Sequence, residues 1–220
     1  MTPVEWAGAS PEDHPAMAGH VREGRRLDVL HGIAVAGVNL AIWQRPGRHP
    51  AIDRAMLEEV DDVAIEAEVA HLAADLPPAL AACGYAARDA QALAADIALL
   101  AQPLASAVAV TRVAIRLDVV ETDACRRFHA DYVQARLICT YVGPGTQWLD
   151  DADAVRLAAG ADPAALAVRH IATGDAAIFK GRLWAPDAPI VHRSPPIAAS
   201  GDHRLLLVID PAPPEPIAHA

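Results

Sequence analysis

The order of apolar and polar residues divides the chain into a part with helical periodicity and a part with strand periodicity. Apolar residues three and four apart predict a helix over 51–76, ended by Pro77 and Pro78, and a second helix over 89–100. From Thr111 the period becomes two, which is typical of a strand with one buried face. The remaining predicted elements are strands over 112–119, 136–142, 175–180, 190–193 and 204–209, one or two short strands over 27–43, and a short helix over 163–171.

The same pattern sets the limits of one predicted domain over 27–210. Residues 1–26 are rich in Pro, Gly, Ala and charge and show no periodicity, which predicts a mobile lead-in. Within the domain we expect a mainly helical layer over 27–110 and a β-rich part over 111–210. Four prolines in 211–220 predict a disordered tail.

Composition and charge exclude several classes of protein. The 220 residues carry a net charge of −10, whereas a general nucleic-acid binder needs a basic face. The longest apolar run, over 90–110, is interrupted by Asp96 and Pro103, and no uninterrupted run approaches the roughly 20 residues that cross a bilayer. The first 20 residues lack the basic start and apolar stretch of a signal peptide. We therefore expect neither a nucleic-acid partner nor a membrane.

The cysteines indicate a reducing compartment. Cys83, Cys125 and Cys139 cannot all pair with one another, and the chain has no CxxC motif, so a cytoplasmic location is the simplest expectation. Cys125 and Cys139 can also be read as soft metal ligands, which would suggest zinc. Small buried apolar residues are the favoured interpretation for both.

A His-x-Asp pair in the segment Phe128-His129-Ala130-Asp131 is the main chemical signal. On an extended segment the side chains of residues i and i+2 project to the same side, so His129 and Asp131 converge on one ion. His192, on a predicted strand, is the best candidate for a third ligand. Two histidines and one carboxylate on one face of a metal form the facial triad of non-haem Fe(II) oxygenases.

Two features around His192 add to this signal. The segment Gly174-Asp175-Ala176-Ala177-Ile178-Phe179 precedes it, and Arg204 follows it by 12 residues at the start of a predicted strand. A guanidinium there can hold the distal carboxylate of an oxo-acid cosubstrate through a bidentate pair. The competing interpretation is a surface arginine at a strand end, and Arg193 and His203 are nearby alternatives. Strand alternation points Arg193 away from the face that carries His192.

In this order and spacing the chain resembles the 2-oxoglutarate/Fe(II) dioxygenase superfamily. The resemblance implies an α+β fold class, with a double-stranded β-helix (jelly-roll) over 111–210 and an α-helical N-terminal layer. More closely, three runs resemble the bacterial domain-of-unknown-function family 1826, which carries no established activity. They are Phe128-His129-Ala130-Asp131-Tyr132, the stretch from Arg136 to Thr146, and His192-Arg193-Ser194-Pro195-Pro196.

The superfamily resemblance implies a role for each site residue. His129, Asp131 and His192 would bind Fe(II), and the cosubstrate would be 2-oxoglutarate. Arg204 would hold its C5 carboxylate. Tyr141 or Thr140 would add a hydrogen bond, although strand alternation allows only one of the two to face inward.

Two alternatives use the same residues differently. A non-catalytic or cupin-like protein that holds zinc or another divalent ion, in zinc or iron homeostasis, needs the three ligands but not Arg204. A structural or partner-binding module needs none of them. The expected small-molecule substrate is not indicated by the sequence, and neither is the oligomeric state.

Overall fold

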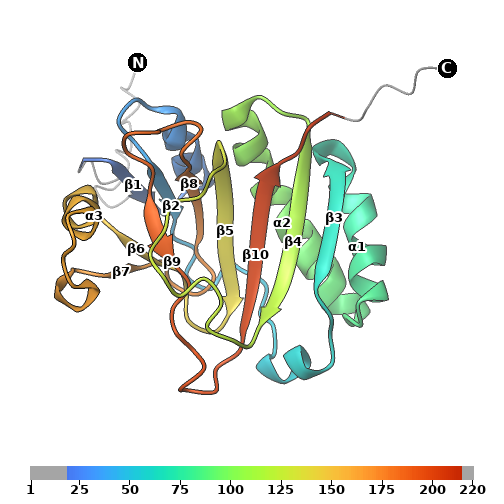
Figure 1. Cartoon of the computed structure of the whole chain (residues 1–220). Helices are drawn as coiled ribbons and strands as arrows, with labels where there is room; N and C mark the ends of the chain where they lie inside the picture. Colours follow the sequence, from blue (N-terminus) through green and yellow to red (C-terminus); the bar gives the residue numbers. More distant parts are fainter. Residues whose placement is uncertain (1–18, 215–220) are drawn as a thin grey trace, which may run out of the picture.

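Strands from both halves of the chain form two sheets, as Figure 1 shows. The computed structural model describes residues 19–214. The strands of this part are β1 (Val21–Gly24), β2 (Leu40–Trp43), β3 (Val63–Glu68), β4 (Arg112–Val120), β5 (Ala135–Val142), β6 (Gln147–Leu149), β7 (Arg169–His170), β8 (Ala176–Lys180), β9 (Val191–Arg193) and β10 (Arg204–Pro211). The large sheet has the order β1-β2-β8-β5-β10-β4-β3, and the small sheet has the order β7-β6-β9.

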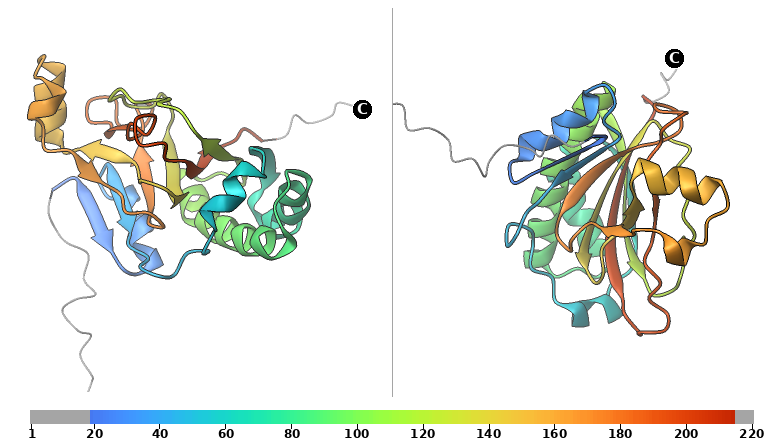
Figure 2. Two further views of the ribbon diagram at one scale, coloured as in Figure 1. Left: turned by 90° about the horizontal axis from the view of Figure 1, so that it is seen from below. Right: turned by 90° about the vertical axis from the view of Figure 1, so that its left-hand side faces the viewer.

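The two sheets and the helices form layers. The helices are α1 (Leu72–Ala82), α2 (Ala87–Val108) and α3 (Asp151–Ala158), with 3-10 helices η2 (Leu27–Ala34), η3 (Arg54–Glu58), η4 (Val69–His71) and η5 (Pro163–Ala165). Figure 2 shows α1 and α2 on one face of the large sheet, and the small sheet with α3 on the other side. Neighbouring strands are antiparallel, except for the parallel pair β1 and β2. The fold is thus a mixture of helix and strand dominated by one large sheet.

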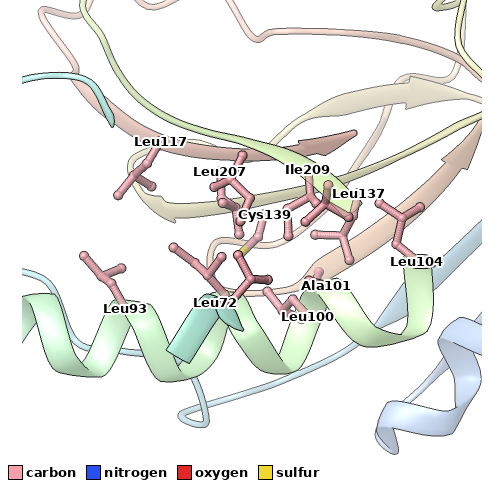
Figure 3. Packing of buried hydrophobic residues seen from close by; sticks show 14 of the residues in the cluster. Leu72, Leu93, Leu100, Ala101, Leu104, Leu117, Leu137, Cys139, Leu207 and Ile209 are labelled. Atoms are coloured by element: carbon pink, nitrogen blue, oxygen red, sulfur yellow. The ribbon is translucent and has the colours of Figure 1, made fainter. Parts of the chain in front are cut away.

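Alternation along the central strands supplies the main core. In β4 the residues Val113, Ile115 and Leu117 are buried on the helix side, as their period of two predicts. Figure 3 shows the apolar stripe of α2 packed against side chains of β4, β5 and β10. Burial of each such leucine contributes about 1.5–3 kcal/mol. The opposite face of β5 and β10 is left to the second layer, where the candidate site lies.

Helix α2 confirms the helix predicted over 89–100 and extends beyond it. It runs through Pro103 to Val108 and ends at Ala109, whose φ of 56° is left-handed. By length and composition it is the one helix of the described residues that could cross a membrane, yet 56% of its apolar window is buried inside the protein. Packing against the large sheet accounts for that apolar composition.

The helix predicted over 51–76 is wrong. This segment forms η3, strand β3 and the first residues of α1. A spacing of four residues equals about one helical turn but also two repeats of a strand, so Val63 and Ala67 fit both patterns. Both side chains are buried on one face of β3, which pairs with β4. The spacing fits both a helix and a strand, and pairing with β4 selects the strand.

Other boundaries also differ from the predictions. Pro77 and Pro78 lie inside α1 and do not end it, because that helix continues to Ala82. The segment 163–171 forms η5 and β7, so the short helix predicted there is wrong, and α3 was not predicted. Predictions for 1–18 and 215–220 lie outside the described residues.

The N-terminal half combines helices with strands of the large sheet. It contributes β1, β2 and β3 to the large sheet, and β1 lies within the segment expected to be a mobile lead-in. The sheet structure is therefore not confined to 111–210. Strand β1 is short and pairs in parallel with β2, and a run of four residues carries too little alternation to be recognised.

A buried ion pair connects α2 to the end of β2. Arg45 is 0% exposed, and its Nη1 lies 2.6 Å from Oδ1 of Asp96, which is 9% exposed. The Tyr141 hydroxyl donates to the other carboxylate oxygen of Asp96 at 2.7 Å. The Arg45 Nε donates to the Gly174 carbonyl, and the Asp175 carboxylate accepts the Arg45 backbone N–H. The Gly-Asp pair before β8 is thus explained by this network.

We predict that Asp96→Ala lowers the free energy of unfolding by about 3–5 kcal/mol, because it leaves a buried guanidinium without its counter-charge. Urea denaturation measures this loss. Asp89→Ala, in the first turn of the same helix, is the matched control and should cost less than about 1 kcal/mol. Equal losses in the two variants would contradict the prediction.

Candidate metal centre

Two reciprocal backbone hydrogen bonds join His129 to His192. The His129 N–H donates to the His192 carbonyl, and the His192 N–H donates to the His129 carbonyl, each at 2.9 Å. Through this antiparallel bridge, His129 pairs with β9 on the side opposite β6, at the edge of the small sheet. Because directly opposed residues of an antiparallel pair project to the same face, the two rings come together, with centroids 4.8 Å apart.

Asp131 completes the group from the same segment as His129. Its Oδ1 lies 3.5 Å from Nε2 of His129, and its Oδ2 lies 3.4 Å from Nε2 of His192. The three ligand atoms lie within 4.8 Å of one another. The structure therefore brings together the three residues of the predicted triad.

Backbone carbonyls orient both imidazoles. The Nδ1 of His129 lies 2.8 Å from the Arg127 carbonyl, and the Nδ1 of His192 lies 3.5 Å from the Ile190 carbonyl. A neutral histidine that donates through Nδ1 presents the lone pair of Nε2. Both Nε2 atoms face the Asp131 carboxylate, so the donor set is two imidazole nitrogens and one carboxylate oxygen.

Arg136, at the start of β5, holds the Asp131 carboxylate in place. Its Nη1 donates to Oδ2 of Asp131 at 2.9 Å. Its Nε and Nη2 donate to the two carboxylate oxygens of Asp210, at 2.7 and 2.8 Å. The bidentate pair with Asp210 fixes the guanidinium plane, and that plane in turn fixes Asp131.

These contacts decide the charge of Asp131. Burial alone would raise the pKa of this carboxyl, but hydrogen bonds from His129 and His192 and the positive charge of Arg136 hold it well below its ordinary value. The hydrogen bond to Asp131 raises the pKa of His129. The site therefore presents an ionised carboxylate to any bound cation.

The two histidines of the triad line a cavity of about 210 Å³ between the two layers, which we call the triad cavity. His129 and His192 line it on one side, and the strand residues Ile138, Leu206 and Val208 line the other. Its complete lining is Arg116, Asp118, Val120, Ala124, Cys125, His129, Arg136, Ile138, Thr146, His192, Arg193, Ser194, Leu206 and Val208.

Arg204 lies behind this cavity and is 0% exposed. Its Nε donates to the Pro144 carbonyl at 2.8 Å, and its Nη1 donates to the Ser194 hydroxyl at 3.0 Å. Its Nη2 lies 3.2 Å from the Thr140 hydroxyl and 3.5 Å from that of Thr146. Burial lowers its pKa to about 10, and within residues 19–214 no carboxylate pairs with it. The guanidinium is therefore a buried cation surrounded by neutral oxygens.

The turn between β5 and β6 packs directly on Arg204. Gly143 has a φ of +81°, and a Cβ added there would clash with the His203 carbonyl and lie 3.0 Å from Cγ of Arg204. Only glycine fits this approach. The turn thus delivers the Pro144 carbonyl to Arg204 and the Thr146 side chain to the triad cavity.

Strand alternation separates Thr140 from Tyr141, as expected. Thr140 faces Arg204, whereas Tyr141 faces α2 and donates to Asp96. Tyr141 is therefore excluded as a contact to a ligand in the triad cavity, and Thr140 is the one of the two on the site's face.

The cysteines do not join the ligand group. Cys139 is fully buried on the helix side of β5, where its sulfur lies 3.2 Å from Nη2 of Arg45, and burial raises its pKa to about 12. Cys125 lines the triad cavity, but the only metal-ligand cluster found in the described residues comprises His129, Asp131 and His192. A thiolate argument for zinc is therefore not supported.

The family model described as "Protein of unknown function (DUF1826)" matches residues 24–210. The chain belongs to this family. The match includes every residue of the triad, Arg136 and Arg204, and it confirms the resemblance noted in the sequence. No curated protein sequence matches this DUF1826 chain.

Several solved structures resemble the DUF1826 chain distantly. A dioxygenase for auxin oxidation from rice is 15% identical at a TM-score of 0.37, covering 87% of this chain and 63% of its own. The dioxygenase for auxin oxidation from Arabidopsis thaliana, in complex with 2-oxoglutarate, is 13% identical at 0.37, covering 70% and 62%. A C-terminally truncated Neurospora crassa protein in its apo form is 14% identical at 0.38, covering 84% and 86%. The chain spans less than two thirds of the two plant enzymes, and these likenesses assign no role to its residues.

Sequence reasoning missed Arg136, Asp210 and Ser194 as parts of this site. Arg136 follows Asp131 by five residues on a predicted strand, so its closeness to the triad could be inferred from the sequence. Its partner Asp210 lies 74 residues away, and that contact could not. Ser194 stands two residues after His192, on the same side of the strand, which is a signal that alternation offers.

We predict that Arg136→Met weakens metal binding about 10–100-fold, because Asp131 loses the donor that orients it. Cobalt(II) binding followed by visible absorption measures the dissociation constant. Arg116→Met removes a positive charge from the same cavity without touching Asp131, and it should bind cobalt at least as tightly as the unmodified protein. Unchanged affinity in Arg136→Met would contradict the positioning role.

Proposed function

We propose that this chain is a non-haem Fe(II)- and 2-oxoglutarate-dependent oxygenase. One observation carries the proposal: the two histidines of the triad and two hydroxyl groups that contact a buried arginine without a counter-charge line the same cavity. His129 and His192 line that cavity together with Thr146 and Ser194, whose hydroxyls contact Arg204. The histidines could hold a metal while Arg204 holds the distal carboxylate of a small acid that is bound to the same metal.

The donor set fits the proposed metal. Two neutral imidazoles and one carboxylate on one side of an ion are the ligands of non-haem Fe(II) sites that keep other positions open. Both imidazoles direct Nε2 at an ionised Asp131, so a cation bound between them would be held by two nitrogen lone pairs and one carboxylate oxygen. When bound, Fe(II) with 2-oxoglutarate supplies the capacity to activate O2 for oxidation of a substrate.

Arg204 supports 2-oxoglutarate as the cosubstrate. A buried cation without a counter-charge is costly, and a carboxylate is the group that removes that cost. The hydroxyls of Thr140, Thr146 and Ser194 can each turn to donate to a carboxylate oxygen. Arg204 would therefore fix the C5 carboxylate, and Thr140 would add a hydrogen bond.

The cavity walls support a water-poor reaction site. Ile138, Leu206 and Val208 form an apolar side of the triad cavity, and the Phe179 ring lies 5.0 Å from the His192 ring. Apolar walls strengthen charge interactions within the site and limit unwanted side reactions.

The finer fold and the cellular setting belong to the same proposal. Two facing sheets with mainly antiparallel neighbours are consistent with a double-stranded β-helix, of which the small sheet would be the minor side. Three free cysteines agree with a reducing cytoplasm. We propose a small-molecule substrate, and neither a nucleic-acid nor a membrane partner.

One observation favours a non-catalytic, cupin-like metal-binding protein as a second candidate. Arg204 already donates to four oxygens of its own chain, so these contacts by themselves give it a structural role. Such a protein would hold a divalent ion at the same triad and would not bind 2-oxoglutarate.

We predict that anaerobic addition of Fe(II) and 2-oxoglutarate produces a weak visible charge-transfer band. The His129→Ala, Asp131→Ala double variant should lose both the band and iron retention, because two of the three ligands are gone. Absence of the band, with no more iron retained by the unmodified protein than by the double variant, would refute the oxygenase.

Arg204→Ala separates the two candidate functions. The oxygenase predicts loss of 2-oxoglutarate binding with iron retained, whereas the cupin-like protein predicts no change in either ligand. Thr146→Val and Ser194→Ala remove single hydroxyls beside Arg204 and test the same point if the alanine variant does not fold.

A further inference from the structure

A second hollow adjoins the triad cavity on its outer side. It has a volume of about 550 Å³, and we call it the arginine hollow. It is lined by Arg126, Arg127, Phe128, Leu157, Pro163, Arg193 and Pro196. Three of these seven residues are cationic and the other four are apolar.

The positive charge gathered here is unusual for this chain. The protein as a whole has a net charge of −10, so acidic residues outnumber basic ones and most arginines have a carboxylate available as a partner. Arg126 has one acidic neighbour, Asp123, at 3.8 Å. That carboxylate also accepts the backbone N–H groups of Ile197 and Ala198, each at 2.8 Å. The other two arginines of the hollow have no acidic partner within residues 19–214.

Contacts with Phe128 and Gln147 preorganise the Arg193 side chain. Its guanidinium carbon lies 4.2 Å from the centre of the Phe128 ring, and its Nε donates to the Gln147 side chain at 2.7 Å. Stacking and this hydrogen bond fix the guanidinium plane, so little conformational entropy remains to be lost on binding. Its two Nη groups donate to no residue in 19–214. A planar pair of free donors matches the two oxygens of a carboxylate or phosphate.

The arginine hollow and the triad cavity are connected. Arg193 lines both of them. Arg127 lines the hollow, and its carbonyl accepts from His129. A molecule whose charged end contacts Arg193 can therefore extend toward the triad along one path.

We propose that the arginine hollow binds the anionic end of the substrate. The substrate would carry a carboxylate or phosphate that pairs with Arg193, assisted by Arg127, and an apolar part that contacts Phe128 and Leu157. This assignment rests on the proposed oxygenase, for which it names the substrate class: small apolar acids. It is separate from the 2-oxoglutarate position at Arg204.

Binding of small aromatic anions tests the assignment. The full chain is loaded with zinc as a redox-inert metal and saturated with 2-oxoglutarate, so that the probes do not compete at Arg204. Phenylacetate and phenyl phosphate are the carboxylate and phosphate probes, and benzyl alcohol is the neutral one. Calorimetry at about 150 mM salt, where long-range charge effects are screened, measures their dissociation constants.

We expect at least one anion to bind about tenfold more tightly than benzyl alcohol. Arg193→Gln should weaken that anion about tenfold, and Arg127→Gln about threefold, with 2-oxoglutarate binding unchanged in both. Arg88→Gln removes an equal charge from the exposed start of α2 and should stay within about twofold of the unmodified protein. The tighter anion identifies the substrate as carboxylate or phosphate.

Four results would overturn the assignment. They are no binding of either anion, equal binding of benzyl alcohol, equal anion binding in Arg193→Gln, or loss of 2-oxoglutarate in that variant. If Arg193→Gln does not fold, Arg127→Gln decides, because the exposed Arg127 side chain makes no hydrogen bond within residues 19–214. If no iron and 2-oxoglutarate band forms but the anion still binds through Arg193, the oxygenase fails and the anion site stands.

Discussion

The paired backbone hydrogen bonds between His129 and His192 are the constraint on which the candidate site depends. They connect a loop segment before β5 to strand β9, two parts of the chain 63 residues apart. Once this bridge forms, both imidazoles project to one side, and the i+2 position of Asp131 brings its carboxylate to them. The small sheet therefore does more than cover the large one, because its edge brings the three candidate ligands together.

Three buried or half-buried arginines of this protein differ in how their charge is balanced. Arg45 pairs with Asp96 in the core, and Arg136 is shared by Asp131 and Asp210. Arg204 is as buried as Arg45 but contacts neutral oxygens alone within the described part of the chain. The first two arginines hold elements of the fold and the triad in place. The third is the position at which an added carboxylate would lower the electrostatic cost.

Local rules predicted the triad, and tertiary contacts decided most of what was missed. The i, i+2 relation of His129 and Asp131 is a property of any extended segment, and alternation correctly allowed only one of Thr140 and Tyr141 on the site's face. Which of the two faces belongs to the site depended on where α2 packs. The helix expected over 51–76 failed because a four-residue spacing suits both periods, and pairing with β4 selected the strand. The role of Arg136 depends on Asp210, a contact that no local pattern contains.

Anomalous diffraction at the iron edge, from crystals grown anaerobically with Fe(II), tests the metal site most directly. The account predicts one strong peak about 2.0–2.2 Å from Nε2 of His129, Nε2 of His192 and one carboxylate oxygen of Asp131. Arg136 should still contact the carboxylate in that crystal. A well-ordered site with no anomalous peak between these three side chains, or a peak held by other residues, would contradict the account.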